Sequence, residues 1–437
     1  MTQSKYIVAI DLGTSHLVGM VGWKNEQGKL NILADEVDDS ASSIQRGCVF
    51  NVTVTADRIN RLLKKLQNRL SSKVPDCQIE KVYIGVGGQS LHSVEHFEVR
   101  TINANAAVTD EDIRKLDEQR KAYKPETLDV LGVTPPTYYV DGKATDNPVG
   151  IPCKRIEAHY KLIVGQRSIQ TYIASCFDQI SDIKLAGIIV SPLSLAETML
   201  GRDEKDLGCA LVDFGAGTTS VVVYKRNKLA HLCVIPLGGD LITKDLTSHL
   251  PFVESDAERL KIKYGSAIMN KDKENPFLSD AKDGIGIREF NTVVEARAQE
   301  IVENVCAQVK LSRVDSLGTG VFLAGRASAL NNLQELLQEK LRQEVRFSTI
   351  QKEWMENEDD RMGNPLYMIA ISLLIKGTEN CVSNVSPPEE DKTDKTNTPG
   401  NKGGKGSRKF WGKQTDGEES KGDNLFEKIF GPLINQE

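Results

Sequence analysis

The sequence has 437 residues, 39% of them hydrophobic and 27% charged, which is ordinary for a soluble protein and long enough for two or more domains. The net charge of −6 argues against a chain that mainly binds nucleic acid, because phosphate backbones require a basic surface. The eight cysteines form no CxxC pair, so we interpret them as reduced core thiols rather than a zinc site or a disulfide framework.

The opening residues lack the layout of a signal peptide, and no apolar run reaches the roughly 18 residues needed to span a bilayer. We therefore expect an intracellular protein whose membrane contacts are peripheral.

The first half of the chain predicts strands that alternate with helices. The stretch "KYIVAIDLGTSHLVGMVGW" predicts two apolar strands around a tight turn at Gly13. Thr109 is the expected N-cap of a later helix. The other expected elements are a helix over 57–70, a strand over 81–88, a helix over 108–123, and strand–helix pairs within 160–180 and 184–200.

The second half of the chain begins with the same sequence pattern. The stretch "GCALVDFGAGTTSVVVYK" again predicts a strand that ends in an aspartate, a glycine turn and a second strand. The elements expected after it are helices over 240–250, 255–265 and 288–314, a strand, glycine turn and helix over 320–341, and a final apolar helix over 364–377.

This duplication indicates a site between two similar halves. A lone turn of this type is usually only a β-hairpin, but two of them, followed by "FLAGRAS", favour a bound nucleotide. Asp11 and Asp213 are expected to face one cleft and to hold Mg²⁺ through its waters, because Mg²⁺ dehydrates reluctantly. The residues expected to grip phosphate are Gly13, Thr14, Ser15, Gly215, Ala216, Gly217, Thr218 and Thr219.

The set of turns resembles the actin-like ATPase superfamily, which implies ATP as the ligand. The segment 234–243 resembles the connecting segment of that superfamily, and the segment 256–267 resembles its helix near the adenine and ribose. By this resemblance Gly325, Arg326 and Ala327 frame the nucleoside together with Glu258 and Lys261, and Gly238 and Gly239 belong to the connecting segment. An ordinary solvated helix face is the alternative for Glu258 and Lys261.

An insertion between the two glycine turns narrows the resemblance. "TDNPVGIPCKRIEAHYKLIVG" and "VYIGVGGQSLHSVE" closely resemble the inserted 1C subdomain of the bacterial FtsA cell-division family. That family also ends in a polar linker and a short amphipathic membrane-targeting helix. The chain is therefore identified as a member of the FtsA family, by features that cover nearly its whole length.

The resemblance implies an α/β actin-like two-domain ATPase fold, made of duplicated ribonuclease-H-like domains with an inserted 1C subdomain of the SHS2 type. The implied subdomains are 1A (1–82, 166–195 and 364–378), 1C (83–165), 2A (196–240 and 311–363) and 2B (241–310), followed by a disordered linker (379–422) and an amphipathic segment (423–437).

Two positions depart from the family pattern, and one expected feature is missing. Arg326 replaces the second of two adjacent glycines in the adenosine loop, so it can stack on the adenine or crowd it. Ser372 stands where a glycine is common. No residue is an evident activator of the attacking water, so we expect slow ATP hydrolysis at most, with ATP setting the conformation.

Partners are also implied by the resemblance. The family tethers filaments of the tubulin-like FtsZ to the cytoplasmic face of the cell membrane, assembles as actin-like protofilaments through 1C and neighbouring subdomains, and contacts other division proteins. The FtsZ C-terminal tail is expected to dock on subdomain 2B, with Arg297 as a cationic contact. The alternative for Arg297 is an ordinary exposed helix arginine.

The C-terminal segment "DNLFEKIFGPLINQE" predicts a short amphipathic helix that ends near Phe430, because Pro432 cannot continue it. A basic patch with two aromatic residues precedes it and favours anionic lipid. The residues expected to enter the membrane are Phe410, Trp411, Leu425, Phe426, Ile429, Phe430, Leu433 and Ile434.

Two other functions stay open at this point. A sugar or small-molecule kinase of the same superfamily has the same glycine turns, but it has no use for a lipid-seeking tail. A pilus-assembly actin homologue of the PilM type has a similar inserted subdomain, and the Phe- and Ile-rich C-terminal segment argues against it.

Overall fold

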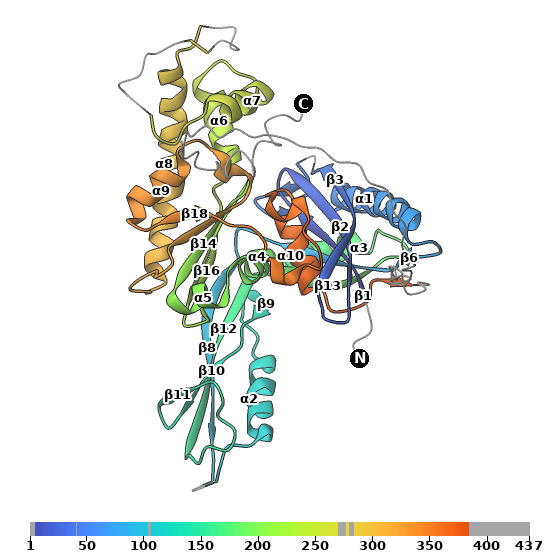
Figure 1. Ribbon diagram of the computed structural model, residues 1–437, viewed down its shortest axis with the longest axis vertical. Helices are drawn as coiled ribbons and strands as arrows, with labels where there is room; N and C mark the ends of the chain where they lie inside the picture. The colour runs from blue at the N-terminus through green and yellow to red at the C-terminus, as the bar shows by residue number, and fades with distance from the viewer. Residues whose placement is uncertain (1–4, 41, 104–105, 270–276, 279–283, 384–437) are drawn as a thin grey trace, which may run out of the picture.

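The computed structural model describes residues 5–40, 42–103, 106–269, 277–278 and 284–383 (Figure 1). The predicted C-terminal anchor and most of the predicted linker lie outside these residues. Among the described residues, no helix is both long and apolar enough to cross a membrane.

The first half is built on a five-stranded sheet with the order β13-β7-β1-β2-β3. Its strands are β1 Lys5–Leu12, β2 His16–Lys24, β3 Leu30–Asp39, β7 Lys81–Val86 and β13 Lys184–Val190. Short strands β4 Ile44–Gln45 and β5 Cys48–Val49 pair with each other beside it.

Helices cover both faces of this sheet. They are α1 Val52–Lys73, α3 Ser168–Phe177, α4 Ser191–Met199 and α10 Met368–Lys376. Two glycines of β2 allow the close packing, because a Cβ on Gly19 would meet Leu62 and Leu66 of α1, and one on Gly22 would meet Leu374 of α10. The β2 strand is therefore held between α1 and α10.

The second half is built on a ten-stranded sheet that continues into the insertion. Its order is β11-β10-β12-β8-β16-β15-β14-β17-β18, with β9 also paired to β12. The strands are β8 His92–Thr101, β9 Leu128–Val133, β10 Thr137–Val140, β11 Lys143–Thr145, β12 Arg155–Gln166, β14 Cys209–Phe214, β15 Thr219–Lys225, β16 Lys228–Ile235, β17 Val321–Ala324 and β18 Val345–Phe347.

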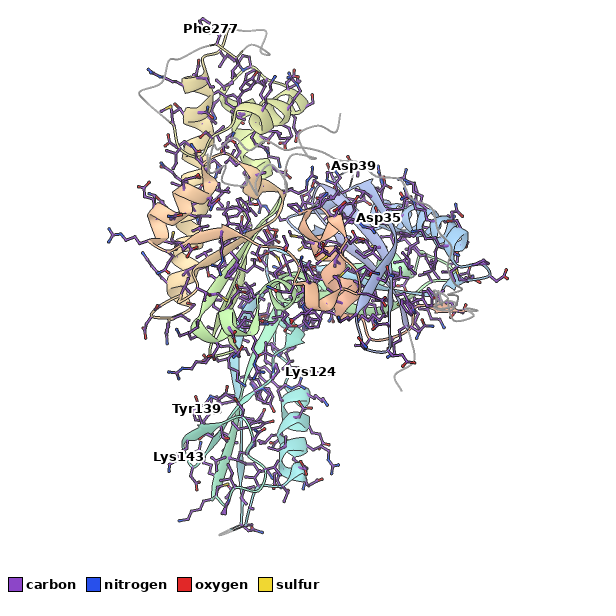
Figure 2. The ribbon with its side chains drawn as sticks, viewed as in Figure 1. Asp35, Asp39, Lys124, Tyr139, Lys143 and Phe277 are labelled. Atoms are coloured by element: carbon purple, nitrogen blue, oxygen red, sulfur yellow. The ribbon has the colours of Figure 1, made fainter. Side chains whose placement is uncertain are left out.

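The remaining helices belong to this half and to the insertion. They are α2 Asp110–Ala122, α5 Arg202–Leu207, α6 Gly239–His249, α7 Glu254–Tyr264, α8 Ile287–Leu311 and α9 Leu333–Leu341, with 3₁₀ turns η1 Arg326–Ala329, η2 Lys352–Trp354 and η3 Asp360–Gly363. Thr109 caps α2 as predicted, through a capping box with Asp112. The insertion and the α6–α8 unit lie at opposite ends of the molecule, as Lys143 and Phe277 show in Figure 2.

The predicted duplication appears in the strand order. In the first half β1 pairs antiparallel with β2 and parallel with β7, and in the second half β14 pairs antiparallel with β15 and parallel with β17. The two turns have the same length, because the last strand pair is Leu12 with Leu17 in the first half and Phe214 with Thr219 in the second. Two copies of one folding unit therefore present their glycine turns in equivalent places.

The beginning of the predicted disordered linker was wrong. Cys381 and Val382 are buried, and β19 Val382–Ser383 pairs with β6 Gln78–Ile79. The amide of Cys381 also donates to the carbonyl of Tyr6 at 2.7 Å. Polar composition gave no indication of this edge pairing, so the packed chain extends at least to Ser383.

The predicted start of subdomain 1C also falls inside a strand. A limit between residues 82 and 83 divides β7, which lies whole in the sheet of the first half. The other subdomain limits stay predictions.

Candidate functional site

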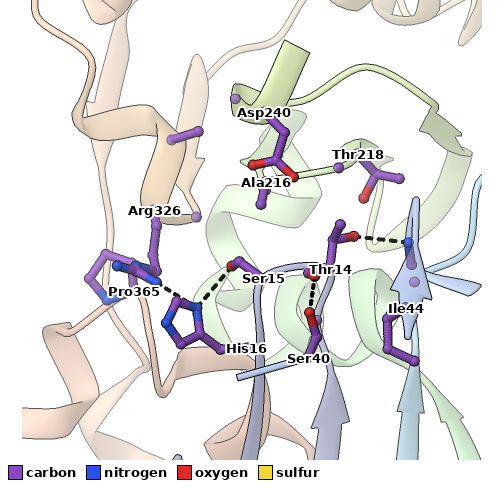
Figure 3. A pocket seen from close by; sticks show the side chains of 18 of the residues that line it. Thr14, Ser15, His16, Ser40, Ile44, Ala216, Thr218, Asp240, Arg326 and Pro365 are labelled. Carbon is purple, nitrogen blue, oxygen red and sulfur yellow. Dashed lines mark hydrogen bonds between the residues drawn. The ribbon is translucent and has the colours of Figure 1, made fainter. Parts of the chain in front are cut away.

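A cleft of about 930 Å³ separates the two halves, which is large enough for a nucleotide. The β1–β2 turn (residues 13–16) lines it from the first half, and the β14–β15 turn (residues 215–218) lines it from the second. Helices α6 and α7 and the turn η1 complete its wall. Figure 3 shows Thr14 and Ser15 opposite Ala216 and Thr218, with His16 beside Ser15 and turned toward Arg326.

Most residues predicted to bind the nucleotide line this one cleft. Those that line it are Asp11, Gly13, Thr14, Ser15, Asp213, Gly215, Ala216, Gly217, Thr218, Gly239, Glu258, Lys261, Gly325, Arg326 and Ala327. Two others lie behind the wall. The hydroxyl of Thr219 is turned away to donate to the carbonyl of Leu237 at 2.8 Å, and Gly238 packs against the carbonyl of Ala216.

The two turns approach each other so closely that only glycine fits at the contact. A Cβ on Gly217 would lie 2.5 Å from the hydroxyl of Thr14. Gly325 has a φ of +83°, and a Cβ there would collide with the carbonyl of Phe214. Gly217 therefore allows the close contact between the two halves, and Gly325 allows η1 to pack against the end of β14.

Two carboxylates lie at the base of the cleft without an ion pair among the described residues. Burial raises the pKa of Asp11 to about 7, and the carboxylate of Asp213 adds to the rise. Burial raises the pKa of Asp213 to about 6. A cation between them would offset this cost, because it favours the charged form of both groups.

The first turn is held by the segment between β3 and β5, through one side-chain donor and two backbone donors. The hydroxyl of Ser40 donates to the carbonyl of Thr14, and the amide of Ser40 donates to the carbonyl of Ser15 at 3.1 Å. The amide of Gly47 donates to the hydroxyl of Thr14 at 3.1 Å. Sequence reasoning missed Ser40, directly after β3, and Gly47, in the tight turn between β4 and β5, because neither belongs to a motif.

The second turn is held by the N-terminus of α6. The amides of Gly239 and Asp240 donate to the carbonyls of Gly215 and Ala216 at 3.0 and 2.9 Å. Asp240 also lines the cleft, and burial raises the pKa of its carboxyl while Lys261 opposes the rise. Sequence reasoning missed Asp240, although an acidic residue directly after the Gly238–Gly239 pair was visible.

On the α7 side, Glu258 and Lys261 form one network with α6. The ammonium of Lys261 donates to Glu258 at 2.6 Å, to the hydroxyl of Thr243 at 2.9 Å and to the carbonyl of Gly239 at 3.1 Å. The hydroxyl of Thr243 also donates to Glu258. The two residues thus join α7 to α6 beside the cleft, rather than forming a purely solvated helix face.

Comparison with known proteins decides the family. A model of "Cell division protein FtsA" matches residues 210–372, and a model of the "SHS2 domain inserted in FTSA" matches residues 88–164. The FtsA protein of Porphyromonas gingivalis is 33% identical over 386 residues, which cover 86% of this chain and 79% of that protein. This chain belongs to the FtsA family.

More distant FtsA proteins match over a similar extent. The Bacillus subtilis protein is 26% identical, with 80% of each chain covered, and the Escherichia coli protein is 25% identical, with 90% of this chain and 95% of that protein covered. The FtsA resemblance drawn from the insertion is therefore confirmed.

Among solved structures, a chain of the PilM–PilN type IV pilus biogenesis complex matches with a TM-score of 0.59 and 14% identity, covering 85% of this chain and 98% of that one. At this identity the match concerns the fold alone. It supports the predicted actin-like fold, and the SHS2 match confirms the type of the insertion.

Proposed function

We propose that this chain binds ATP and Mg²⁺ between its two halves, self-assembles at midcell and anchors FtsZ filaments to the inner face of the cytoplasmic membrane. The anchor in this proposal is the C-terminal amphipathic segment, and the assembled protein helps to recruit later division proteins. The observation that carries the proposal is the cleft with two facing glycine turns, found in a chain of the FtsA cell-division family.

The residues in the cleft fit a nucleoside triphosphate. Backbone amides in glycine-rich turns suit phosphate oxygens, because no side chain blocks their approach. In this arrangement residues 13–15 and 215–218 hold the phosphates from opposite sides, and Glu258, Lys261 and Ala327 lie beside the nucleoside.

The acidic pair fits a magnesium ion. Two buried carboxylates with raised pKa values are unfavourable when both are charged, so a divalent cation that bridges them through its waters stabilises the site. Asp11 and Asp213 would hold the ion, which supplies charge neutralisation at the phosphates. We propose that hydrolysis is slow and that bound ATP mainly sets the conformation.

For the FtsZ tail we propose the α6–α8 unit, with Arg297 of α8 as one contact. The guanidinium of Arg297 donates to Asp245 of α6 at 2.5 and 3.1 Å and also contacts Glu300. An acidic tail must therefore share or displace these carboxylates, which limits the affinity that Arg297 alone contributes.

The membrane role is tested by liposome co-sedimentation of the full chain and of a chain that ends at Ser383, with and without FtsZ. Ending at Ser383 preserves Asn380 and Cys381, which hydrogen-bond to Tyr6 of the first sheet. We expect only the full chain to pellet and to carry FtsZ with it. If both chains pelleted equally, the tail would not be the anchor.

A matched pair of substitutions separates loss of the anchor from loss of tail length. Phe430→Glu removes an apolar residue from the predicted face, whereas Glu427→Gln changes a polar residue of the same segment. We expect the first substitution to release the chain from liposomes and the second to leave it bound.

The nucleotide role is tested by isothermal titration with ATP in the presence and absence of Mg²⁺. We expect Mg²⁺ to tighten binding to the unsubstituted chain, and Asp213→Asn to remove most of that gain. Mg²⁺ dependence that survived in both Asp11→Asn and Asp213→Asn would exclude this acidic pair as the metal site.

A further inference from the structure

Arg326 crosses the cleft and contacts the opposite half of the molecule. Its side chain extends from η1 in the second half, and its Nη1 donates to Nδ1 of His16 at 2.9 Å (Figure 3). His16 is the last residue of the first glycine turn and the first residue of β2. We call this hydrogen bond the Arg326–His16 clasp.

The partner of Arg326 is unusual for a cation within this chain. Other partly buried arginines pair with carboxylates, such as Arg58 with Asp38, Arg100 with Asp112 and Arg297 with Asp245.

Among the described residues, no carboxylate lies within ion-pair distance of Arg326, which lines the cleft. Burial lowers its pKa, and Glu258 opposes this only at longer range. The guanidinium therefore lacks a close counter-anion.

The clasp places the guanidinium beside the first glycine turn. The same Nδ1 of His16 also lies 2.9 Å from the hydroxyl of Ser15. Because a guanidinium can only donate, Nδ1 must be the unprotonated nitrogen, so the two donors share one lone pair. If Arg326 leaves, the hydroxyl of Ser15 can still donate to Nδ1, so the exchange leaves no ring nitrogen without a hydrogen bond.

We propose that Arg326 binds a phosphate group of the nucleotide and gives up its hydrogen bond to His16 when it does so. Phosphate offers a negative charge and two oxygens to the planar guanidinium fork, where neutral imidazole offers one lone pair. This inference rests on the proposed nucleotide site and assigns Arg326 to the phosphates rather than to the adenine.

The clasp also joins the two halves of the molecule, since His16 belongs to the first sheet and Arg326 follows β17 of the second. When phosphate replaces His16, the direct link becomes a link through the ligand. Nucleotide binding and the contact between the halves are then coupled through one side chain.

The test compares three ligands on the full chain, by titration or by displacement of a fluorescent ATP analogue. ATP contains base and phosphates, adenosine contains no phosphate, and tripolyphosphate contains no base. We expect Arg326→Gln to weaken ATP and tripolyphosphate by roughly tenfold to a hundredfold, as for loss of one charged hydrogen-bonding group, and adenosine by less than about twofold. Arg342→Gln, an exposed arginine outside the cleft, is the matched control and should change none of them.

Other outcomes would overturn the proposal. An equal loss for adenosine and ATP would place the guanidinium on the base, and unchanged or tighter ATP binding would mean that Arg326 only crowds the site. An unsubstituted chain that bound none of the three ligands would overturn the proposed function itself. Circular dichroism and Arg326→Lys, which keeps the charge and should retain part of the affinity, separate these results from misfolding.

The exchange of His16 for phosphate is tested through His16. Because His16→Leu removes the competing acceptor, we expect it to tighten ATP binding by about twofold to tenfold in the unsubstituted chain and to have no effect when combined with Arg326→Gln. An effect of the same size in both backgrounds would show that His16 acts independently of Arg326 and would overturn the exchange.

Discussion

The two glycine turns have the same frame but are built differently. Both follow a strand that ends near an aspartate, and both leave the same span, residues 13–16 and 215–218, between the last paired residues. The first turn, Gly-Thr-Ser-His, is rich in side chains, whereas the second, Gly-Ala-Gly-Thr, is mostly backbone.

Their supports differ in the same way. The hydroxyl of Ser40 and the backbone amides of Ser40 and Gly47 hold the first turn, through bonds to Thr14 and Ser15. The second turn places its carbonyls on the first amides of α6, so backbone alone fixes it. The turn therefore has the same position in both halves, while each half stabilises it with a later segment of its own sequence.

The largest effect is expected where the two turns meet. Gly217→Ala places a methyl group 2.5 Å from the hydroxyl of Thr14, and Thr14 cannot easily retreat because Gly47 holds it. We expect ATP affinity to fall by more than about a hundredfold, which isothermal titration can measure. Thr14→Ala should partly restore binding to Gly217→Ala, since it removes the two nearest atoms.

Gly132→Ala in the insertion is a suitable control. A Cβ there meets its nearest neighbour at an ordinary 3.4 Å, so we expect unchanged affinity. If Gly217→Ala bound ATP normally, the turns would not need their close approach, and the second turn would be no more sensitive to side chains than the first.

Much of this arrangement could be predicted from the sequence, because each turn is marked by a short local pattern. Strand, aspartate and glycine occur together within a few residues, so Asp11, Gly13, Asp213 and Gly215 could be assigned to one site from their spacing alone. The supports of the first turn could not be predicted, because Ser40 and Gly47 are distant from it in sequence and carry no motif.

Long-range pairing escaped prediction for the same reason. The chain around Cys381 has the polar composition of a linker, yet it forms an edge strand with residues about 300 positions earlier. The clasp was equally hidden, because nothing in the sequence places His16 beside Arg326. Residues within one short motif could be predicted from the sequence, but contacts between distant segments could be identified only from the folded structure.

The aspartates before the two turns, Asp11 and Asp213, make the stability of the chain depend on pH. The pKa of Asp11 is raised to about 7, so between about pH 4 and pH 7 the folded chain holds a proton that the unfolded chain has released. The stability of the Mg²⁺-free chain therefore falls as pH rises through this window. We expect Asp11→Asn to be more stable than the unsubstituted chain by on the order of 4 kcal/mol at pH 8, with little difference near pH 4.

Urea unfolding in EDTA at several pH values measures this effect, with exposed Asp182→Asn as the control. Asp213→Asn should show the same sign over a narrower window, because the pKa of Asp213 rises only to about 6. A stability difference for Asp11→Asn that did not change between pH 4 and pH 8 would contradict the raised pKa.

The smallest effect concerns the side-chain support of the first turn. Ser40→Ala removes the hydroxyl that donates to the carbonyl of Thr14, while the backbone bond from Ser40 to Ser15 remains. We expect a loss of about 1 kcal/mol in unfolding free energy and a few-fold weaker ATP binding, because a single neutral hydrogen bond contributes this much. Urea unfolding and titration on the same variant measure both quantities.

The second turn offers the contrasting case. Thr219→Val removes a side-chain bond behind that turn, to the carbonyl of Leu237, without touching the bonds from α6. If backbone fixes the second turn, Thr219→Val lowers stability but leaves ATP affinity within about twofold, whereas Ser40→Ala lowers both. Equal losses of affinity in the two variants would mean that side chains position both turns, and the difference between the halves would be one of sequence only.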